Sequence, residues 1–312
     1  MSGIPISDNP VEHLRSTLSL SAMHTIRLTS PAPPLREYVR FYASRVVRTG
    51  KTAVLHPVPA RAFPVVDFIF GDRFQVLYPS QSRIETSPRA AVVGLQTHCR
   101  SQLQFQGSAE CFAILFQPTG LHRLFSTPAH ELTDHAYEAH AVLGAFFSQL
   151  EQLLGGTSNF EERVRFADRF LLQHSSGARR FDRISAAASQ ILCARGNARI
   201  ADLASNAGLS ARQFERCFME QVGVPPKLYS RIVRFEAALD NKARSFAKSW
   251  TDVAHESGYY DQMHMVHDFE GFTGGTPTRI LREAEMLFRD QIHALQSGRY
   301  AATTSGDLQL IL

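Results

Sequence analysis

The chain has 312 residues, of which 44% are hydrophobic and 20% charged, and its formal net charge is +4. This composition excludes a wholly disordered protein, and 19 glycines and 15 prolines are too few for collagen or a low-complexity chain. The four cysteines are scattered without a CxxC pair, and no apolar stretch approaches the ~20 residues of a membrane helix. We therefore expect a cytoplasmic protein that has no membrane partner.

The first part of the chain is predicted to hold strands and then helices. Residues 1–25 show no sustained period and are expected to be irregular, and Leu35–Tyr42 is expected to form a short helix. From 54 to 117, short runs rich in Val, Ile and Phe alternate with turn residues, which favours a sandwich or a small barrel. Helical spacing follows in Ala141–Leu154 and Phe160–Leu172.

A polar stretch of small residues at 174–180 is predicted to be a linker. It separates a first domain at 26–176 from a second domain at 181–295, in which every segment has helical character. The sequence thus predicts an α+β protein in which a β-rich domain precedes an all-α domain.

The second domain contains an internal repeat. The run that starts at Leu203 (LASNAG) returns 50 residues later at Val253 (VAHESG). Further on, a Phe, a Gly and a Pro follow one another at spacings of 5 and 3 residues in both copies, beginning at Phe218 and at Phe269. Each copy has the pattern of a helix-turn-helix: a small alanine where two helices cross, a glycine where the chain leaves the first helix, and a cap before the second.

The repeat also predicts which side chains of each second helix face outward. Phe214 and Phe218 are spaced to face inward in the first copy, as are Met265 and Phe269 in the second. The outward positions are free to meet a DNA groove. In the first copy they are Ala211, Arg212, Glu215 and Arg216, and in the second they are Gln262, Met263, Val266 and His267. The cap Ser210 and His264 are further candidate DNA contacts.

Residues ~181–282 resemble the DNA-binding domain of the AraC/XylS family of bacterial transcription regulators. The most specific part of the resemblance is the run Gly258-Tyr259-Tyr260-Asp261-Gln262-x-His264, and Arg231 matches the start of the family's linker helix. The resemblance implies seven helices that hold two helix-turn-helix units, whose reading helices enter successive major grooves of promoter DNA. By position, Arg212, Arg216 and Arg231 would contact DNA, and Arg212 and Arg216 suit guanine while Gln262 suits adenine.

The charge is uneven along the second domain. Residues 210–248 carry eight Lys or Arg and four acidic residues, whereas residues 249–312 carry four Arg and nine acidic residues. Because phosphate neutralisation drives affinity, we expect the first unit and the linker helix to dominate DNA binding.

The first domain resembles the N-terminal domain of an uncharacterised AraC-like group, for example at Phe63–Phe70 and Phe116–Gly120. The resemblance implies a cupin-like β-barrel with flanking helices that senses a small-molecule effector. The candidate effector-binding side chains are aromatic: Phe68, Phe70, Phe105, Phe112 and Phe116. Two readings stay open for them, because they either line a pocket or fill the core. A homodimer is expected through Ala141–Leu154 or Phe160–Leu172, and RNA polymerase is a further candidate partner.

Other functions have less support in the sequence. We expect no cofactor, no metal and no catalytic residue, because the chain has no His-x-His pair, no G-x-S-x-G elbow and no phosphate-binding glycine loop. His264 and His267 lie near Asp261 and Asp268, but such pairs on a helix surface are more often not metal ligands. The alternative is a β-barrel enzyme or small-molecule carrier with a helical appendage that does not bind DNA.

Overall fold

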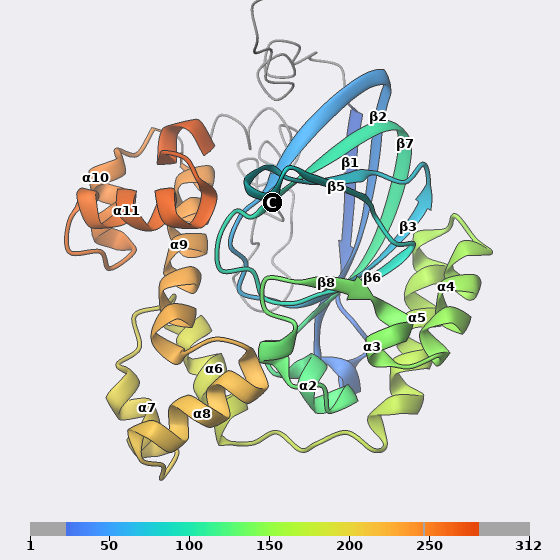
Figure 1. Ribbon diagram of the computed structural model, residues 1–312. Helices are drawn as coiled ribbons and strands as arrows, with labels where there is room; N and C mark the ends of the chain where they lie inside the picture. The colour runs from blue at the N-terminus through green and yellow to red at the C-terminus, as the bar shows by residue number, and fades with distance from the viewer. Residues whose placement is uncertain (1–22, 246, 281–312) are drawn as a thin grey trace, which may run out of the picture.

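The computed structural model describes residues 23–245 and 247–280, which form a sheet flanked by helices and a helical C-terminal part (Figure 1). In this part of the chain, no helix has the length and apolar character needed to cross a membrane. The α+β class predicted from the sequence is confirmed.

The sheet has eight strands in the order β1-β2-β7-β3-β6-β8, and β4 and β5 form a hairpin beside β7. All the strand pairs are antiparallel. In the described residues β1 and β8 each have one neighbour, so the predicted barrel is an open, curved sheet. The strands are β1 (Met23–Thr29), β2 (Val39–Val58), β3 (Val65–Gly71), β4 (Gln75–Tyr78), β5 (Arg83–Thr86), β6 (Ala90–Val93), β7 (Ser101–Phe116) and β8 (Ala136–Glu138).

Two of the strands are much longer than the short runs predicted. β2 has 20 residues and β7 has 16, and their pairing register shifts beside the opposed residues Gly50 and Gly107. Both glycines have positive φ, 59° and 90°, which a residue without Cβ adopts most easily. Such irregularities bend a strand, and the two halves of β7 accordingly pair with different partners, β4 and β3.

Several predicted boundaries are corrected. β1 begins at Met23, inside the segment 1–25 that was expected to be irregular, and the rest of that segment lies outside the described residues. The helix expected at Leu35–Tyr42 is only the 3-10 turn η2 (Pro33–Leu35), because Val39 already pairs with β7. The helix expected at Ala141–Leu154 is interrupted at Gly144, whose φ is +115°.

The helices of the β-rich part differ in length, and the longer ones pack against the sheet. Figure 1 shows α4 and α5 along one side of the sheet. In chain order they are α2 (Gly120–Phe125), η4 (Ala129–Glu131), α3 (Ala139–Leu143), α4 (Phe146–Gly155) and α5 (Phe160–Ser175), with η3 (Pro79–Gln81) in the β4–β5 hairpin. Residues 176–182 then connect α5 to α6 where the linker was predicted.

The C-terminal part holds two helical pairs joined by the long α9. Six of the seven predicted helices lie in the described residues, and residues 277–280 are helical up to the end of that range. The rest of the seventh helix, which the sequence predicts up to about residue 295, lies outside it. The helices are α6 (Arg183–Cys193), α7 (Ile200–Asn206), α8 (Ala211–Val222), α9 (Pro226–Arg244), α10 (Trp250–Glu256) and α11 (Gln262–Thr273).

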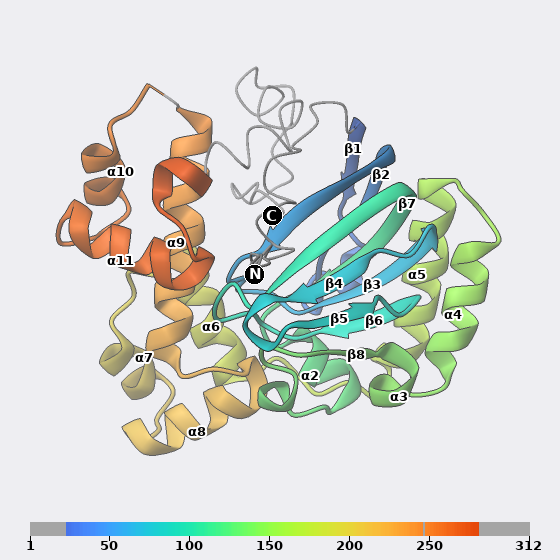
Figure 2. The same ribbon diagram turned by 45° about the horizontal axis from the view of Figure 1, so that its top comes forward.

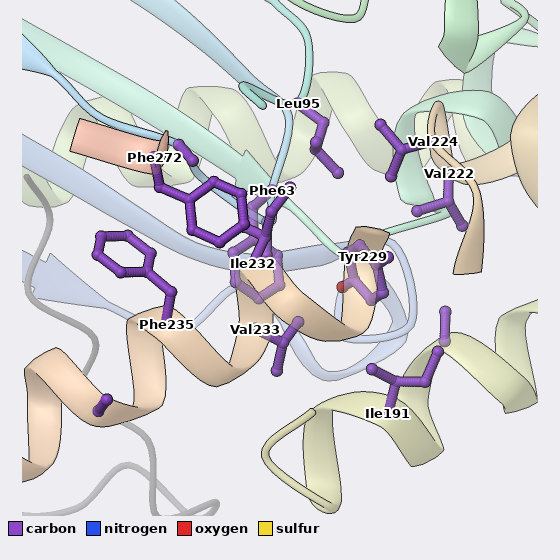
Figure 3. Packing of buried hydrophobic residues seen from close by; sticks show 14 of the residues in the cluster. Phe63, Leu95, Ile191, Val222, Val224, Tyr229, Ile232, Val233, Phe235 and Phe272 are labelled. Atoms are coloured by element: carbon purple, nitrogen blue, oxygen red, sulfur yellow. The ribbon is translucent and has the colours of Figure 1, made fainter. Parts of the chain in front are cut away.

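One hydrophobic core joins the two parts of the chain. Phe63 and Leu95, from loops of the β-rich part, lie in the same buried cluster as Tyr229, Ile232 and other residues of the C-terminal helices (Figure 3). A second core lies between one face of the sheet and α4 and α5. The C-terminal helices are therefore packed against loops of the β-rich part, and Figure 2 shows them beside the sheet.

Candidate nucleic-acid interface and sheet cavity

The first helical pair, α7 and α8, has the turn predicted from the sequence. Gly208 has a φ of +62°, and the amide of Leu209 donates to the carbonyl of Ala204 at 3.1 Å. Ser210 caps α8: its Oγ accepts from the amide of Gln213 at 3.4 Å, and the Gln213 side chain accepts from the Ser210 amide at 3.2 Å. This reciprocal capping fixes where α8 begins.

The second pair, α10 and α11, repeats this geometry. Gly258 has a φ of +77°, and the amide of Tyr259 donates to the carbonyl of Ala254 at 2.9 Å. Asp261 caps α11 by accepting from the amide of His264 at 2.7 Å. Both units are thus helix-turn-helix structures with a glycine in the left-handed region and a side-chain cap.

The inward positions are as predicted. Phe214 and Phe218 are 1% and 0% exposed, and their ring centroids lie 5.7 Å apart. Met265 and Phe269 are both 0% exposed in the second unit. These side chains hold each reading helix against the core and turn its opposite face outward.

The outward face of α8 is basic and accessible. The predicted DNA-contacting residues Ser210, Ala211, Arg212, Glu215 and Arg216 are all exposed. Within the described residues, neither arginine side chain makes an ion pair or a hydrogen bond. Their guanidinium groups are therefore available for phosphate or base edges.

The outward face of α11 is neutral in character. Gln262, Met263, His264 and His267 are exposed, and the Met263 side chain is 62% exposed. The Oε1 of Gln262 accepts a hydrogen bond from the Thr251 hydroxyl at 2.8 Å, so this amide already has an intramolecular partner. In the parts of the chain that the structure describes, no cluster of three His, Cys, Asp or Glu side chains is arranged to hold a metal.

Arg231 has a different environment from the other predicted DNA contacts. Its guanidinium donates through Nη2 and Nε to Oδ1 of Asp268 at 2.7 and 3.1 Å. Asp268 is 1% exposed on α11, so this pair fastens the second reading helix to α9. Sequence reasoning missed the pair because its members are 37 residues apart and no repeat relates them.

Most of the positive charge counted around α9 is likewise engaged within the protein. Of the eight Lys and Arg residues in 210–248, only Arg212, Arg216 and Lys227 have side chains with no hydrogen bond or ion pair in the described residues. The engaged groups are Arg231 with Asp268, Arg234 with the Gly196 carbonyl, Lys242 with the Lys248 carbonyl, Arg244 with Asp240, and Lys248 with Glu256.

A cavity of about 180 Å³ lies on the face of the sheet opposite α4 and α5. Successive strand residues point to opposite faces, so Asp67 and Ile69 of β3 line this cavity while Phe68 faces the helices. Side chains of other strands and of the loops between them, including Arg61, complete the lining. The cavity is therefore formed by the alternate residues that the helices leave uncovered.

This alternation divides the five candidate effector-binding phenylalanines between the two faces of the sheet. Only Phe105 lines the cavity. Phe68, Phe112 and Phe116 are 0% exposed in the core beneath α4 and α5, and the partly buried Phe70 packs against the same core. Aromatic character alone did not reveal the face, because Val39–Val58 and the other long strands place apolar residues on both sides.

The two halves of the chain also meet through polar contacts. The amides of Ala60 and Ala62 donate to the Phe272 carbonyl and to the Glu236 carboxylate, each at 2.9 Å. The hydroxyl of Thr133 donates to the Gly223 carbonyl, at the end of α8, at 2.8 Å. These contacts connect the loops of the sheet to α8, α9 and α11.

Comparisons with known families match both halves of the chain. Residues 203–283 match a family described as a helix-turn-helix domain, and residues 27–138 match one described as a domain of unknown function (DUF6597). No curated protein matches the chain.

Several solved structures are similar to the chain. ToxT from Vibrio cholerae O395 is 13% identical, with 79% of this chain and 98% of that chain covered and a TM-score of 0.43. Unsaturated fatty acid bound ToxT from Vibrio cholerae strain SCE256 is 10% identical, with 83% and 94% covered and a TM-score of 0.44. The AraC-like transcriptional activator CuxR is 14% identical, with 67% and 84% covered and a TM-score of 0.28.

Proposed function

We propose that this chain, which is a DNA-binding transcription regulator of the AraC family, reads promoter DNA mainly with its first helix-turn-helix unit. The observation that carries this proposal is the pair of exposed, unengaged guanidiniums of Arg212 and Arg216 on α8. Arginine binds guanine O6 and N7 with two hydrogen bonds and also neutralises phosphate. The second unit, with its amide, thioether and imidazole groups, then adds base contacts and less phosphate neutralisation.

Binding of the full chain to a mixed DNA library, titrated over a range of salt, tests this proposal. We expect log affinity to fall linearly with log salt concentration, with a slope of several units. Arg216→Ala should cost about 1–3 kcal/mol of binding free energy. Gln262→Ala should cost less, because its amide must first leave Thr251.

A matched control is Arg165→Ala, since Arg165 is exposed on α5, far along the chain from the reading helices. It should leave the affinity and its salt dependence unchanged. Intact affinity after Arg216→Ala combined with abolished affinity after Gln262→Ala would contradict the ranking, and absent or salt-insensitive binding would favour a carrier or enzyme with a helical appendage.

We propose that the sheet cavity is the sensor of a small-molecule effector and has no catalytic role. Burial, together with the neighbouring carboxylate of Asp67, raises the pKa of the Cys111 thiol well above its usual value. Little thiolate forms at neutral pH, so this cavity cysteine is a poor nucleophile. The contacts of Ala60, Ala62 and Thr133 with the C-terminal helices give the cavity a route to the reading helices.

We further propose that the regulator acts in the cytoplasm as a homodimer formed through α4 and α5. Leu153 and Leu172 are 50% and 38% exposed on these helices, which otherwise bury their apolar residues. Leu153→Glu with Leu172→Glu should convert a dimer to a monomer in sedimentation experiments. RNA polymerase is the partner that a promoter-bound activator would contact, and recruitment of polymerase in vitro tests that role.

A further inference from the structure

The interior of the sheet cavity is mainly apolar. Val47, Ile69, Val76, Leu103 and Phe105 are among its lining residues, and the volume is about 180 Å³. For scale, an engineered apolar cavity of about 150 Å³ holds one benzene molecule. The cavity therefore fits a short alkyl chain or a single substituted ring.

Arg61 introduces a charge into this apolar lining. Its Nε atom is buried and has no hydrogen-bond partner, and in the described residues its side chain makes no ion pair within 4.0 Å. Burial lowers the pKa of this guanidinium, against the attraction of Asp67 and Glu236. A buried charge without a close counter-ion is costly, and an anion that enters the cavity removes that cost.

Arg61 shares the cavity lining with other charged groups. Arg45 and Asp67 also line the cavity, and Arg45 lies 5.3 Å from the ring centroid of Phe105. Burial lowers the pKa of Arg45 to about 10, but it stays protonated at neutral pH. Burial raises the pKa of Asp67, while Arg61 counteracts that rise. Asp67 and Glu236 both attract the Arg61 guanidinium, but in the described residues neither forms an ion pair with it.

The other acidic side chains of the lining have partners of their own. Glu110 pairs with Arg163 at 2.6 Å. Asp134 accepts hydrogen bonds from the amide and the hydroxyl of Thr97 at 2.7 and 2.6 Å. At the same rim, Arg100 donates to the Asp134 carbonyl at 3.1 Å. None of these groups supplies a counter-ion to the Arg61 guanidinium within ion-pair distance.

We propose that the cavity binds a small apolar monocarboxylate, with its carboxylate on the Arg61 guanidinium and its apolar body against the interior of the sheet. Arginine matches a carboxylate with two parallel N–H donors, and such charge-assisted bonds are stronger in an apolar surrounding. A cationic ligand would be repelled by the Arg61 guanidinium, and a neutral one would leave the Arg61 charge without a close counter-ion.

The position of Arg61 also connects this site to DNA binding, a consequence that rests on the proposed function. Its two neighbours in the chain make the contacts with the C-terminal helices: Ala60 with the Phe272 carbonyl on α11, and Ala62 with Glu236 on α9. Phe63 follows in the shared core (Figure 3). A carboxylate bound to Arg61 would therefore lie next to Ala60 and Ala62, the two residues whose amides bind α11 and α9.

Calorimetric titration of the full chain with hexanoate, hexanol and hexylamine tests the proposal, because these probes share one alkyl chain and differ in the charge of the head group. We expect hexanoate to bind at least tenfold more tightly than hexanol, and hexylamine to bind more weakly than either. Arg61→Gln should weaken hexanoate at least tenfold and leave hexanol within about twofold, as the loss of a charge-assisted pair predicts.

Two further variants keep the result interpretable. Arg48→Gln makes the same change at an exposed position of β2 that does not line the cavity, and it should alter neither affinity. Arg61→Lys keeps the charge, so it should retain a preference for hexanoate even if Arg61→Gln fails to fold. Equal binding of hexanoate and hexanol, no saturable binding of hexanoate, or unchanged binding in Arg61→Gln would overturn the proposal.

DNA-binding measurements on the same preparations test the carboxylate site and the proposed regulator function separately. A chain that binds DNA but shows no preference for hexanoate refutes the carboxylate site and leaves the regulator intact. A chain that binds hexanoate through Arg61 but no DNA refutes the proposed function and leaves the site. A change in DNA affinity on adding hexanoate that Arg61→Gln removes supports both.

Discussion

The two helix-turn-helix units share a skeleton and differ in surface. Each has a glycine of positive φ in the turn and a capped second helix whose buried pair faces inward. The outward faces differ, because Arg212 and Arg216 are unengaged on α8 whereas α11 presents Gln262, Met263 and histidines. Within one chain, the two units are therefore alike at their inward, packing positions and differ at their outward positions.

The largest expected effect tests whether the units fold as one. Phe218→Ala and Phe269→Ala each remove a fully buried ring from a shared cluster and should each cost about 3–5 kcal/mol of unfolding free energy. Because that cluster spans both units and α9, we expect one thermal transition, followed by circular dichroism. An early, separate transition in Phe269→Ala alone would show that the second unit is independent.

The ion pair between Arg231 and Asp268 sharpens the difference between the units, because the first has no counterpart of it. Arg231→Ala leaves a buried carboxylate without its donor and should cost about 1.5–3 kcal/mol of stability in urea unfolding. In an Asp268→Asn background the same change should cost less. If Arg231→Ala instead weakens DNA binding at unchanged stability, the sequence-based assignment of Arg231 to the DNA interface is the better one.

The helix caps are expected to have closely similar effects in the two units. Ser210→Ala removes the acceptor for the Gln213 amide, and Asp261→Ala removes the acceptor for the His264 amide. Each should cost about 1 kcal/mol. Ser210→Thr and Asp261→Asn, which keep a capping oxygen, serve as controls and should recover most of that stability; a cost near zero at either position would show that water replaces the cap.

A pH dependence is expected from Asp182, which caps α6 and accepts a hydrogen bond from Gln221 of α8, and it is the smallest effect. Burial would raise the pKa of Asp182, but hydrogen bonds from Ser185, Gln221 and the Ile184 amide outweigh it and hold the pKa below its usual value. The stabilisation is therefore present above the unfolded-state pKa, near 3.9, and is lost as pH falls through the lower folded-state value. The difference in unfolding free energy between wild type and Asp182→Asn should become smaller as the pH falls. A difference that is constant from pH 6 to pH 3 would contradict this.

The sequence predicted the C-terminal part well, because each unit is determined by local spacing. A repeat of Gly, Phe and Pro reports turns, caps and inward faces within about twenty residues, and Gly208 and Ser210 lie in the predicted roles. Contacts between distant segments leave no such periodic signal. The pair of Arg231 with Asp268 and the engagement of the α9 lysines and arginines are of this second kind.

The sheet was predicted less accurately for a related reason. Short strands were predicted between 54 and 117, but Ser101–Phe116 is one long strand, β7, which has an irregularity at Gly107. The face of each phenylalanine depends on register, and a shift of one residue moves a side chain to the other side. The cavity therefore had to be found from the structure, together with the unpaired charge of Arg61.

The shared core around Phe63 and Leu95 has a consequence for dissecting the protein. If the loop at 176–182 were cleaved and the fragments separated, Phe63 and Leu95 would become exposed on one fragment and Tyr229 and Ile232 on the other. Each fragment would then carry an exposed apolar surface that favours aggregation. For the same reason, a chimera that joins the β-rich part to another DNA-binding domain would have to exchange the loop around Phe63 together with the helices. The boundary for such a chimera therefore does not coincide with the linker.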